Sequence, residues 1–197
     1  MAGINANKVY MPSPDQSATT GAVATAATGT AAPTDAVTAL PNTWASGGYI
    51  DENGISLGVT RSVTPIKDWS QSVVRNALTD FNATISLAFM QMDEFAATEM
   101  LGASNVTKTA ATTTKGELLK LSIGSELPPV KSWCFSMKDG DRRVRVYIPR
   151  GQITELNGDI TFVPSAVNVW GCTLSTYDDG TGHSLYVFYD DGTKLSA

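Results

Sequence analysis

The amino-acid sequence predicts a mainly β fold, a β-sandwich or barrel with one short flanking α-helix. Five Asn-Gly or Asp-Gly pairs lie beside alternating or β-branched runs, and these dipeptides supply the positive φ angles that tight hairpins need. Helical spacing occurs in one short segment. The pattern predicts about eight or nine strands in all. The five pairs are Asn53-Gly54, Asp139-Gly140, Asn157-Gly158, Asp179-Gly180 and Asp191-Gly192.

The N-terminal third contains a composition signal and a first hairpin. Residues 13–36 are rich in Ala and Thr with two prolines, and composition alone predicts a flexible linker. Further on, "GYI" and "GISLGV" flank the Asn53-Gly54 turn and predict paired strands. The stretch 64–75, "TPIKDWSQSVVR", is polar and contains a proline. We expect it to be a surface connection between the strands "GISLGVTR" and "VVRNALTDFN".

Two segments show strand periodicity most clearly. In "ATISLAFM" and in the hairpin "SWCFSMKDGDRRVRVYIP", alternate residues fall on opposite faces. The first segment predicts a half-buried strand, and the second a strand with one core face and one face that is wet or meets a partner. Three later segments, "GDITFVPS", "VNVWGCTLSTY" and "HSLYVFY", complete the predicted strands. The expected core faces carry Ile85, Leu87 and Phe89 in the first segment and Val144, Val146 and Ile148 in the second, opposite Arg143, Arg145 and Tyr147.

The helical segment is "DEFAATEMLG", residues 93–102. Asp93 is suited to cap its N-terminus and Gly102 to close its C-terminus. Phe95, Met100 and Leu101 are expected to face inward. The following "SNVTKTAATTTKG", residues 104–116, is expected to be a mobile loop between helix and strand.

Composition limits the possible functions. A chain of 197 residues with 42% hydrophobic residues can bury one sizeable core. The net charge of −5 argues against a surface that neutralises nucleic-acid phosphates. No window reaches the ~18 apolar residues of a membrane span, and the N-terminus lacks the pattern of a secretory signal. We therefore expect a protein made in the cytoplasm, with Cys134 and Cys172 as buried thiols, although a disulfide is an open alternative.

No pattern of catalytic or cofactor-binding residues emerges. His183 is the only histidine, it stands beside an Asp-Gly turn, and no nucleophile elbow accompanies it. The acidic turns "YDDGTGH" and "YDDGTK" do not follow the ligand order of a calcium loop, so we interpret them as solvated tips. There is neither a phosphate-binding glycine loop nor a Cys/His metal cluster. We expect no enzymatic activity, no cofactor and no metal.

Five segments taken together resemble the major tail proteins, or tail tube proteins, of long-tailed bacteriophages with non-contractile tails, the siphophage type, especially those of actinobacterial hosts. Their order and spacing fit the family from Gly29 to Gly102, and the second half of the chain agrees in pattern only. The segments are "GTAAPTD" at 29–35, "LPNTW" at 40–44, "GGYIDENGISLGVTRSVTPIKDW" at 47–69, "VVRNALTDFNATISLAFM" at 73–90 and "FAATEMLG" at 95–102.

The resemblance implies a β-sandwich or barrel of which six copies join their sheets into a ring, and rings that stack into a tube through which the genome leaves the capsid. It implies a virion protein of the tail, assembled in the host cytoplasm. The implied partners are copies of itself, a tape-measure protein, tail-tip and tail-terminator proteins, and passing double-stranded DNA, with no membrane. It also revises the linker interpretation: "GAVATAA" at 21–27 becomes a first strand, with smaller residues than the family pattern. Residues 1–20 become an arm, and 21–197 a single domain.

A conduit for DNA must not hold its cargo, and an acidic chain suits a lumen of carboxylates or neutral polar groups. Two other functions stay open: a tube protein of a secretion or injection machine, and a capsid decoration or host-adhesion β-sandwich module. The last would predict exposed aromatics clustered on one loop face, whereas Trp44, Trp69, Trp133 and Trp170 are dispersed.

The stretch 64–75 has two interpretations. From its residues alone, it is a surface loop whose Trp69 folds back onto the core of its own subunit. The resemblance implies instead that the stretch contacts the next ring. For the second interpretation the candidate contact residues are Pro65, Ile66, Lys67, Asp68, Trp69 and Arg75.

Overall fold

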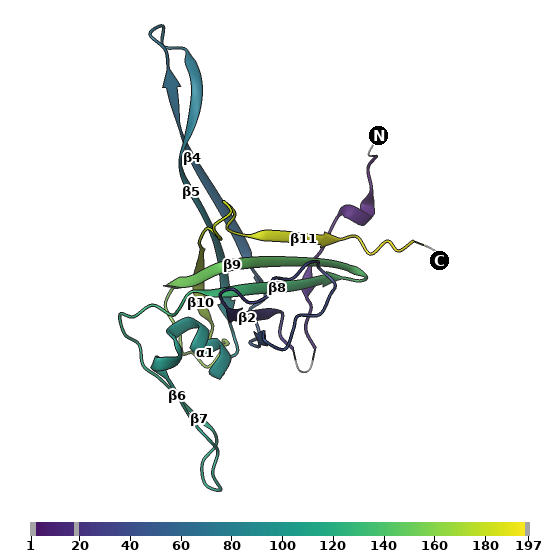
Figure 1. Ribbon diagram of the computed structural model, residues 1–197. Helices are drawn as coiled ribbons and strands as arrows, with labels where there is room; N and C mark the ends of the chain where they lie inside the picture. Colours follow the sequence, from purple (N-terminus) through teal and green to yellow (C-terminus); the bar gives the residue numbers. More distant parts are fainter. Residues whose placement is uncertain (1–2, 18–19, 196–197) are drawn as a thin grey trace.

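The computed structural model describes residues 3–17 and 20–195, and it is mainly β with one short α-helix, as predicted (Figure 1). The helix is α1 (Glu94–Leu101), and two 3-10 turns are η1 (Ala6–Lys8) and η2 (Ala103–Asn105). The strands are β1 (Ser13–Pro14), β2 (Val23–Ala27), β3 (Ala45–Ser46), β4 (Ser56–Lys67), β5 (Val73–Phe89), β6 (Val106–Thr109), β7 (Leu118–Leu121), β8 (Lys131–Asp139), β9 (Arg142–Asn157), β10 (Trp170–Thr176) and β11 (Tyr186–Asp190).

Nine strands form one sheet in the order β3-β2-β8-β9-β10-β5-β4, with β1 added to β8 and β11 to β9. Strand β9 is 16 residues long and joins two halves of this sheet. Its first half pairs with β8 and β11, and its second half pairs with β10. The sheet does not close, and the architecture is sandwich-like. The β6–β7 pair forms a separate sheet.

The main core lies between the two halves of the large sheet and under α1. Ile85, Leu87 and Phe89 of β5 are buried, which confirms the predicted face, while Ser86 between them is exposed. The largest fully buried side chain is Trp133. Burial of an aromatic or aliphatic side chain of this size contributes about 1.5–3 kcal/mol, so these residues determine the position of the sheet.

The second face of β9 is also buried, and the prediction that it is wet or meets a partner is wrong for Arg145 and Tyr147, which are 5% and 6% exposed. Arg145 Nη1 donates to the carbonyl oxygens of Asp35 and Thr38, at 2.8 Å each. Tyr147 packs edge-on against Trp44. The covering segment lies about a hundred positions away in sequence, so strand periodicity could not reveal it.

The Asp35 side chain stabilises the conformation of residues 35–38, the segment that covers the second face of β9. Its carboxylate accepts hydrogen bonds from the Thr38 hydroxyl and from the backbone N–H groups of Thr38 and Val37, and these lower its pKa from 3.8 to about 2. A lowered folded-state pKa contributes stability above the unfolded pKa that is lost as pH falls toward 2. We therefore expect Asp35→Asn to be less stable than the parent at pH 6, with the difference disappearing between pH 4 and pH 2. Urea titrations at these pH values measure it; a difference that does not change with pH would contradict this assignment.

Helix α1 begins and ends as predicted. The Asp93 side chain accepts a hydrogen bond from the Ala96 N–H at 2.8 Å, and Gly102 follows the last turn with φ of 85°. The sequence pattern did not predict the burial of Glu99. Its Oε1 accepts from Lys131 Nζ at 2.6 Å and from the Thr25 hydroxyl at 3.0 Å. This buried cluster connects α1 to β2 and β8.

Strand β2 confirms the strand expected at 21–27, and the composition-based linker interpretation is wrong there. Val23, Ala24, Thr25 and Ala26 are all buried. Strand β2 pairs with both β3 and β8, and its Ala24 and Ala26 pack in a second cluster with Trp44, Cys134 and Tyr147. Small residues suit this position because large rings already occupy the neighbouring space.

All five predicted turn glycines have positive φ, between 60° and 95°. Among these turns, Asp139-Gly140 joins two directly paired strands, β8 and β9. Around Asn53-Gly54 the prediction of paired flanks is wrong, because Ile50 and Ser56 both pair with β5, opposite Phe89 and Ser86. The dipeptides determine local backbone conformation, and the strand partners are set by packing.

Two further expectations are wrong. Residues 158–165, "GDITFVPS", are a connection rather than a strand, because β9 ends at Asn157 and β10 begins at Trp170. Residues 104–116 are not simply a loop, because Val106–Thr109 pair with Leu118–Leu121 in a hairpin. The division into an arm at 1–20 and a domain at 21–197 stays a prediction, and residues 1–2 and 18–19 of that arm lie outside the described residues.

Cys134 and Cys172 are free thiols, and both are buried. Burial raises the pKa of Cys134 to about 11 and that of Cys172 to about 12. Because the thiolate is the reactive species, we expect neither thiol to react with Ellman's reagent in the folded protein at pH 8, and both to react in urea. Rapid reaction without denaturant would contradict their burial.

Candidate functional site

The most prominent feature of the molecule is a long hairpin formed by β4 and β5, which projects from the sandwich (Figure 1). All 12 residues of β4 are exposed. The register runs from Ser56 opposite Ser86 to Lys67 opposite Val73. The prediction of a long surface connection at 64–75 is therefore wrong at both ends, and only Asp68–Ser72 turn outside the strands.

The turn at the tip is organised by Asp68. Its carboxylate accepts from the Ser70 hydroxyl at 2.7 Å and the Ser72 N–H at 2.9 Å, and these bonds lower its pKa. The backbone closes with Asp68 N–H donating to the Ser72 carbonyl. Gln71 has a positive φ of 67°. The side chain of Trp69 is fully exposed, so the interpretation that it folds back onto the core is wrong.

The six candidate contact residues come together at this end of the hairpin. Pro65 pairs with Asn76 and Ile66 with Arg75. Because β4 is at the end of the sheet order, the missing N–H of Pro65 can face outward without loss of a ladder hydrogen bond. Lys67, Asp68 and Trp69 follow directly. The tip thus presents an indole flanked by two cations and a carboxylate.

The two faces of the hairpin differ in polarity, which the sequence interpretation missed. Residues paired across the register share a face, and side chains alternate along each strand. The face that continues from the core carries Leu57, Val59, Val63, Leu78 and Phe81, each 41–60% exposed. The opposite face carries Ser56, Thr60, Ser62, Thr64, Asp80, Asn82 and Thr84. The alternation of apolar residues with other residues in 57–63 was the sequence signal that could have indicated these two faces.

An apolar face of this extent on an exposed hairpin is typical of a protein interface. Two-stranded hairpins are marginally stable alone, so this one gains if another surface covers its apolar side. Arg61 lies over the Phe81 ring at 5.7 Å from its centroid and covers part of the face. The second hairpin, β6–β7, projects in the opposite direction (Figure 1).

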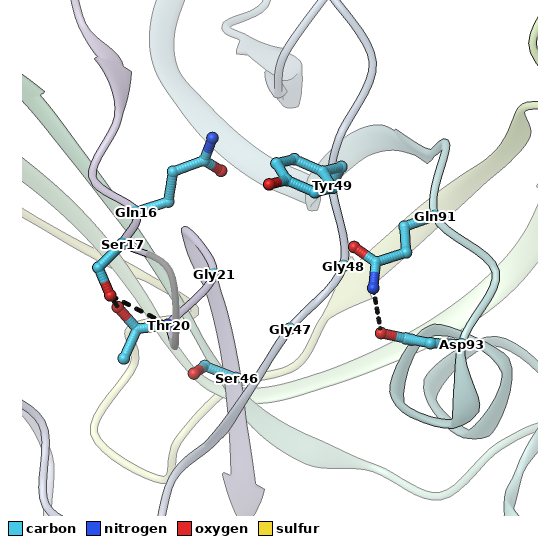
Figure 2. Close-up of a pocket in the computed structure, with 10 residues that line it drawn as sticks. All are labelled: Gln16, Ser17, Thr20, Gly21, Ser46, Gly47, Gly48, Tyr49, Gln91 and Asp93. Atoms are coloured by element: carbon cyan, nitrogen blue, oxygen red, sulfur yellow. Dashed lines mark hydrogen bonds between the residues drawn. The ribbon is translucent and has the colours of Figure 1, made fainter.

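A polar pocket lies between residues 16–17 and 20–21, residues 46–49 and the segment that leads into α1 (Figure 2). Gln91 donates to Asp93 Oδ2 at 2.8 Å, while the other oxygen of Asp93 caps α1. The Ser17 and Thr20 hydroxyls bond to each other. These polar side chains therefore form hydrogen bonds with one another, and Asp93 also stabilises the start of α1. They do not form a nucleophile and base pair.

The side chains around His183 form hydrogen bonds within their own turn. The Thr181 hydroxyl bonds Asp179 at 2.7 Å and His183 Nδ1 at 3.1 Å, and Asp179 also accepts from the Tyr186 hydroxyl. In a catalytic triad the histidine stands between carboxylate and hydroxyl, and here the hydroxyl stands between the other two. The described residues contain no group of three or more potential metal ligands and no helix long and apolar enough to cross a membrane.

A comparison with protein-family models finds one that covers almost the whole chain. The model is described as "Phage tail tube protein", and it matches residues 4–196. A search of curated proteins finds no match.

Proposed function

Because the chain belongs to the phage tail tube protein family, we propose that it polymerises as stacked hexameric rings into the tail tube that conducts DNA from the capsid to the host. The observation that carries this proposal is the exposed, two-faced β4–β5 hairpin on an unpaired sheet edge. The family supports a structural role in the virion tail. The non-contractile, siphophage type of tail is part of the proposal.

Two free sheet edges support ring formation. Strand β4 ends the sheet, and β8 pairs with β9 only as far as Gly151. Opposite β10, the edge of residues 152–157 therefore has no strand partner within the described chain. A long unpaired edge is an aggregation hazard, and pairing between identical copies in a ring removes it. In the proposed ring, β4 of one copy joins this edge of β9 in the next.

Such a ring would contain a wide channel. Each copy contributes β4, β5, β10 and the second half of β9, so six copies make a barrel of ~24 strands, more than the barrels of ~16–18 strands that already enclose aqueous channels. The hairpin face that points away from the core would line it. That face carries hydroxyl and amide groups and few charges, and neutral polar groups give duplex DNA no strong binding site.

The other partners and the place of assembly follow from the same proposal. The tape-measure protein would occupy the lumen during assembly, tail-tip and tail-terminator proteins would meet the two open ends, and assembly would take place in the host cytoplasm. An N-terminal arm at 1–20 would exchange solvent contacts for contacts with neighbouring copies. Reduced protease cleavage before residue 20 after polymerisation is the measurement that tests the arm.

The alternatives differ in what they expect of this surface. A capsid decoration or adhesion module needs a cluster of exposed aromatics, but Trp44, Trp133 and Trp170 are buried and Trp69 stands at a hairpin tip. A tube protein of a secretion or injection machine would share the ring, and it would differ in working outside a virion.

Negative-stain electron microscopy of the concentrated, purified chain tests the proposed function. We expect rings with six-fold symmetry or hollow tubes. Particles that stay monomeric and bind cell-wall glycan would overturn the tube in favour of the adhesion module.

A further inference from the structure

We propose that Trp69 at the hairpin tip of one copy inserts into a specific groove at the base of the next copy, formed where the N-terminal segment crosses the turn before β4. This inference rests on the proposed tube and identifies the contact that stacks its rings.

The groove has the size and the walls that an indole requires. Its volume is about 390 Å³, within the ~300–1,000 Å³ of sites that enclose small organic groups. Pro12 and Pro14 line it from the N-terminal segment, Ile50 and Ile55 from the two sides of the turn before β4, and Met137 from β8. Proline rings, branched aliphatic groups and a thioether are favourable neighbours for an aromatic ring.

The charges around the tip and the groove are complementary. Asp51 and Glu52 lie at the groove. Lys67 and Arg75 flank the strand ends from which Trp69 projects, and they outnumber the one carboxylate of the tip, Asp68, which accepts hydrogen bonds within the turn. A buried aromatic anchor can carry most of the binding energy of an interface, and complementary charges around it select the partner and set the register.

The positions of tip and groove along the chain give the contact its direction. Ile55 directly precedes β4, and Asp68 directly follows it, so the two surfaces lie at opposite ends of one strand. The 12 residues of β4 span about 40 Å at ~3.3 Å per residue. A contact between two different patches at opposite ends is heterologous, and it repeats without closing along a stack. The apolar face of the hairpin would lie along the neighbour between tip and groove.

Site-directed disulfide formation tests this contact in the full-length protein. One variant carries Ser70→Cys in the tip and a second, mass-tagged variant carries Asn53→Cys at the groove. The native thiols are buried and do not compete. On mixing and mild oxidation we expect at least about tenfold more mixed dimer than when Ser70→Cys is paired with Thr113→Cys between β6 and β7, because docking raises the local thiol concentration. Equal yields from the two mixtures would overturn the inference.

Charge reversal provides a second test that does not depend on a disulfide. Lys67→Glu with Arg75→Glu, and separately Asp51→Lys with Glu52→Lys, should each raise the protein concentration needed for assembly by about tenfold, because like charges then face each other. The variant with all four changes should return to within about threefold of the parent. If the quadruple variant needs as high a protein concentration for assembly as the weaker of the two double variants, the inference is overturned.

These outcomes separate the inference from the proposed function. Tubes of the parent protein that form without a disulfide between tip and groove overturn the inference and leave the tube in place. Absence of tubes together with glycan-binding monomers overturns the proposed function itself.

Discussion

Replacing Lys131 with methionine is expected to lower the free energy of unfolding by about 3–5 kcal/mol, because it leaves a carboxylate buried without its cation. The side chain of Glu99 is 4% exposed, and its Oε1 is 2.6 Å from Lys131 Nζ. Helix α1, β2 and β8 all meet at this point through Glu99, Thr25 and Lys131. Urea titration followed by tryptophan fluorescence measures the loss.

Two further variants test whether the stability loss arises because the carboxylate is buried or simply because an ion pair is broken. Glu94→Ala breaks the exposed pair with Lys108 at 3.1 Å, and we expect it to cost less than about 1 kcal/mol. Glu99→Leu combined with Lys131→Met should recover most of the stability lost by Lys131→Met alone, because no charge then remains buried. If Lys131→Met costs no more than Glu94→Ala, the cluster does not hold α1 to the sheet.

Trp69→Ala is expected to leave the monomer as stable as the parent and to impair assembly severely. The side chain is fully exposed, so its removal opens no cavity, and surface changes of this kind alter stability by about 0.5 kcal/mol or less. A central tryptophan in an interface contributes about 2 kcal/mol or more, which corresponds to roughly 30-fold in affinity at each contact. Sedimentation and electron microscopy over a concentration series measure the effect.

Two control variants show the effects expected for an exposed apolar side chain outside the interface and for a buried tryptophan. Val37→Ala also removes an exposed apolar side chain, and it should change neither stability nor assembly. Trp133→Ala removes a buried ring and should destabilise the monomer by about 3–5 kcal/mol. A fall of several degrees in the melting temperature of Trp69→Ala would show that this tryptophan packs on its own subunit, contrary to the structure.

Local features were predicted well because their causes are local. The capped helix depends on Asp93 and Gly102, and the positive φ values depend on glycines after Asn or Asp. The core face of β5 depends on alternation of Ile85, Leu87 and Phe89. In each case the deciding interactions lie within a few residues, so the sequence contains them in readable form.

Predictions that required knowledge of distant partners were wrong or missing. The second face of β9 was expected to be wet or to meet a partner, but the segment that bonds Arg145 comes from residues 35–38. The buried Glu99 could not be recognised because Lys131 lies on another element. The groove proposed for Trp69 draws its walls from three separate parts of the chain.

The stretch 64–75 shows which features follow from the sequence and which require the tertiary structure. From the sequence alone came the β class, the helix, the family resemblance and the six residues proposed for contact. The tertiary structure alone decided that these residues extend a hairpin, that Trp69 projects from it, and that the apolar face of the hairpin stays exposed. The physical reason is that alternation defines two faces for any strand, whereas burial depends on what the rest of the chain places against them. All residues of β4 are exposed within the part of the chain that the structure describes, and the fold thereby leaves its apolar face and its edge available to another copy.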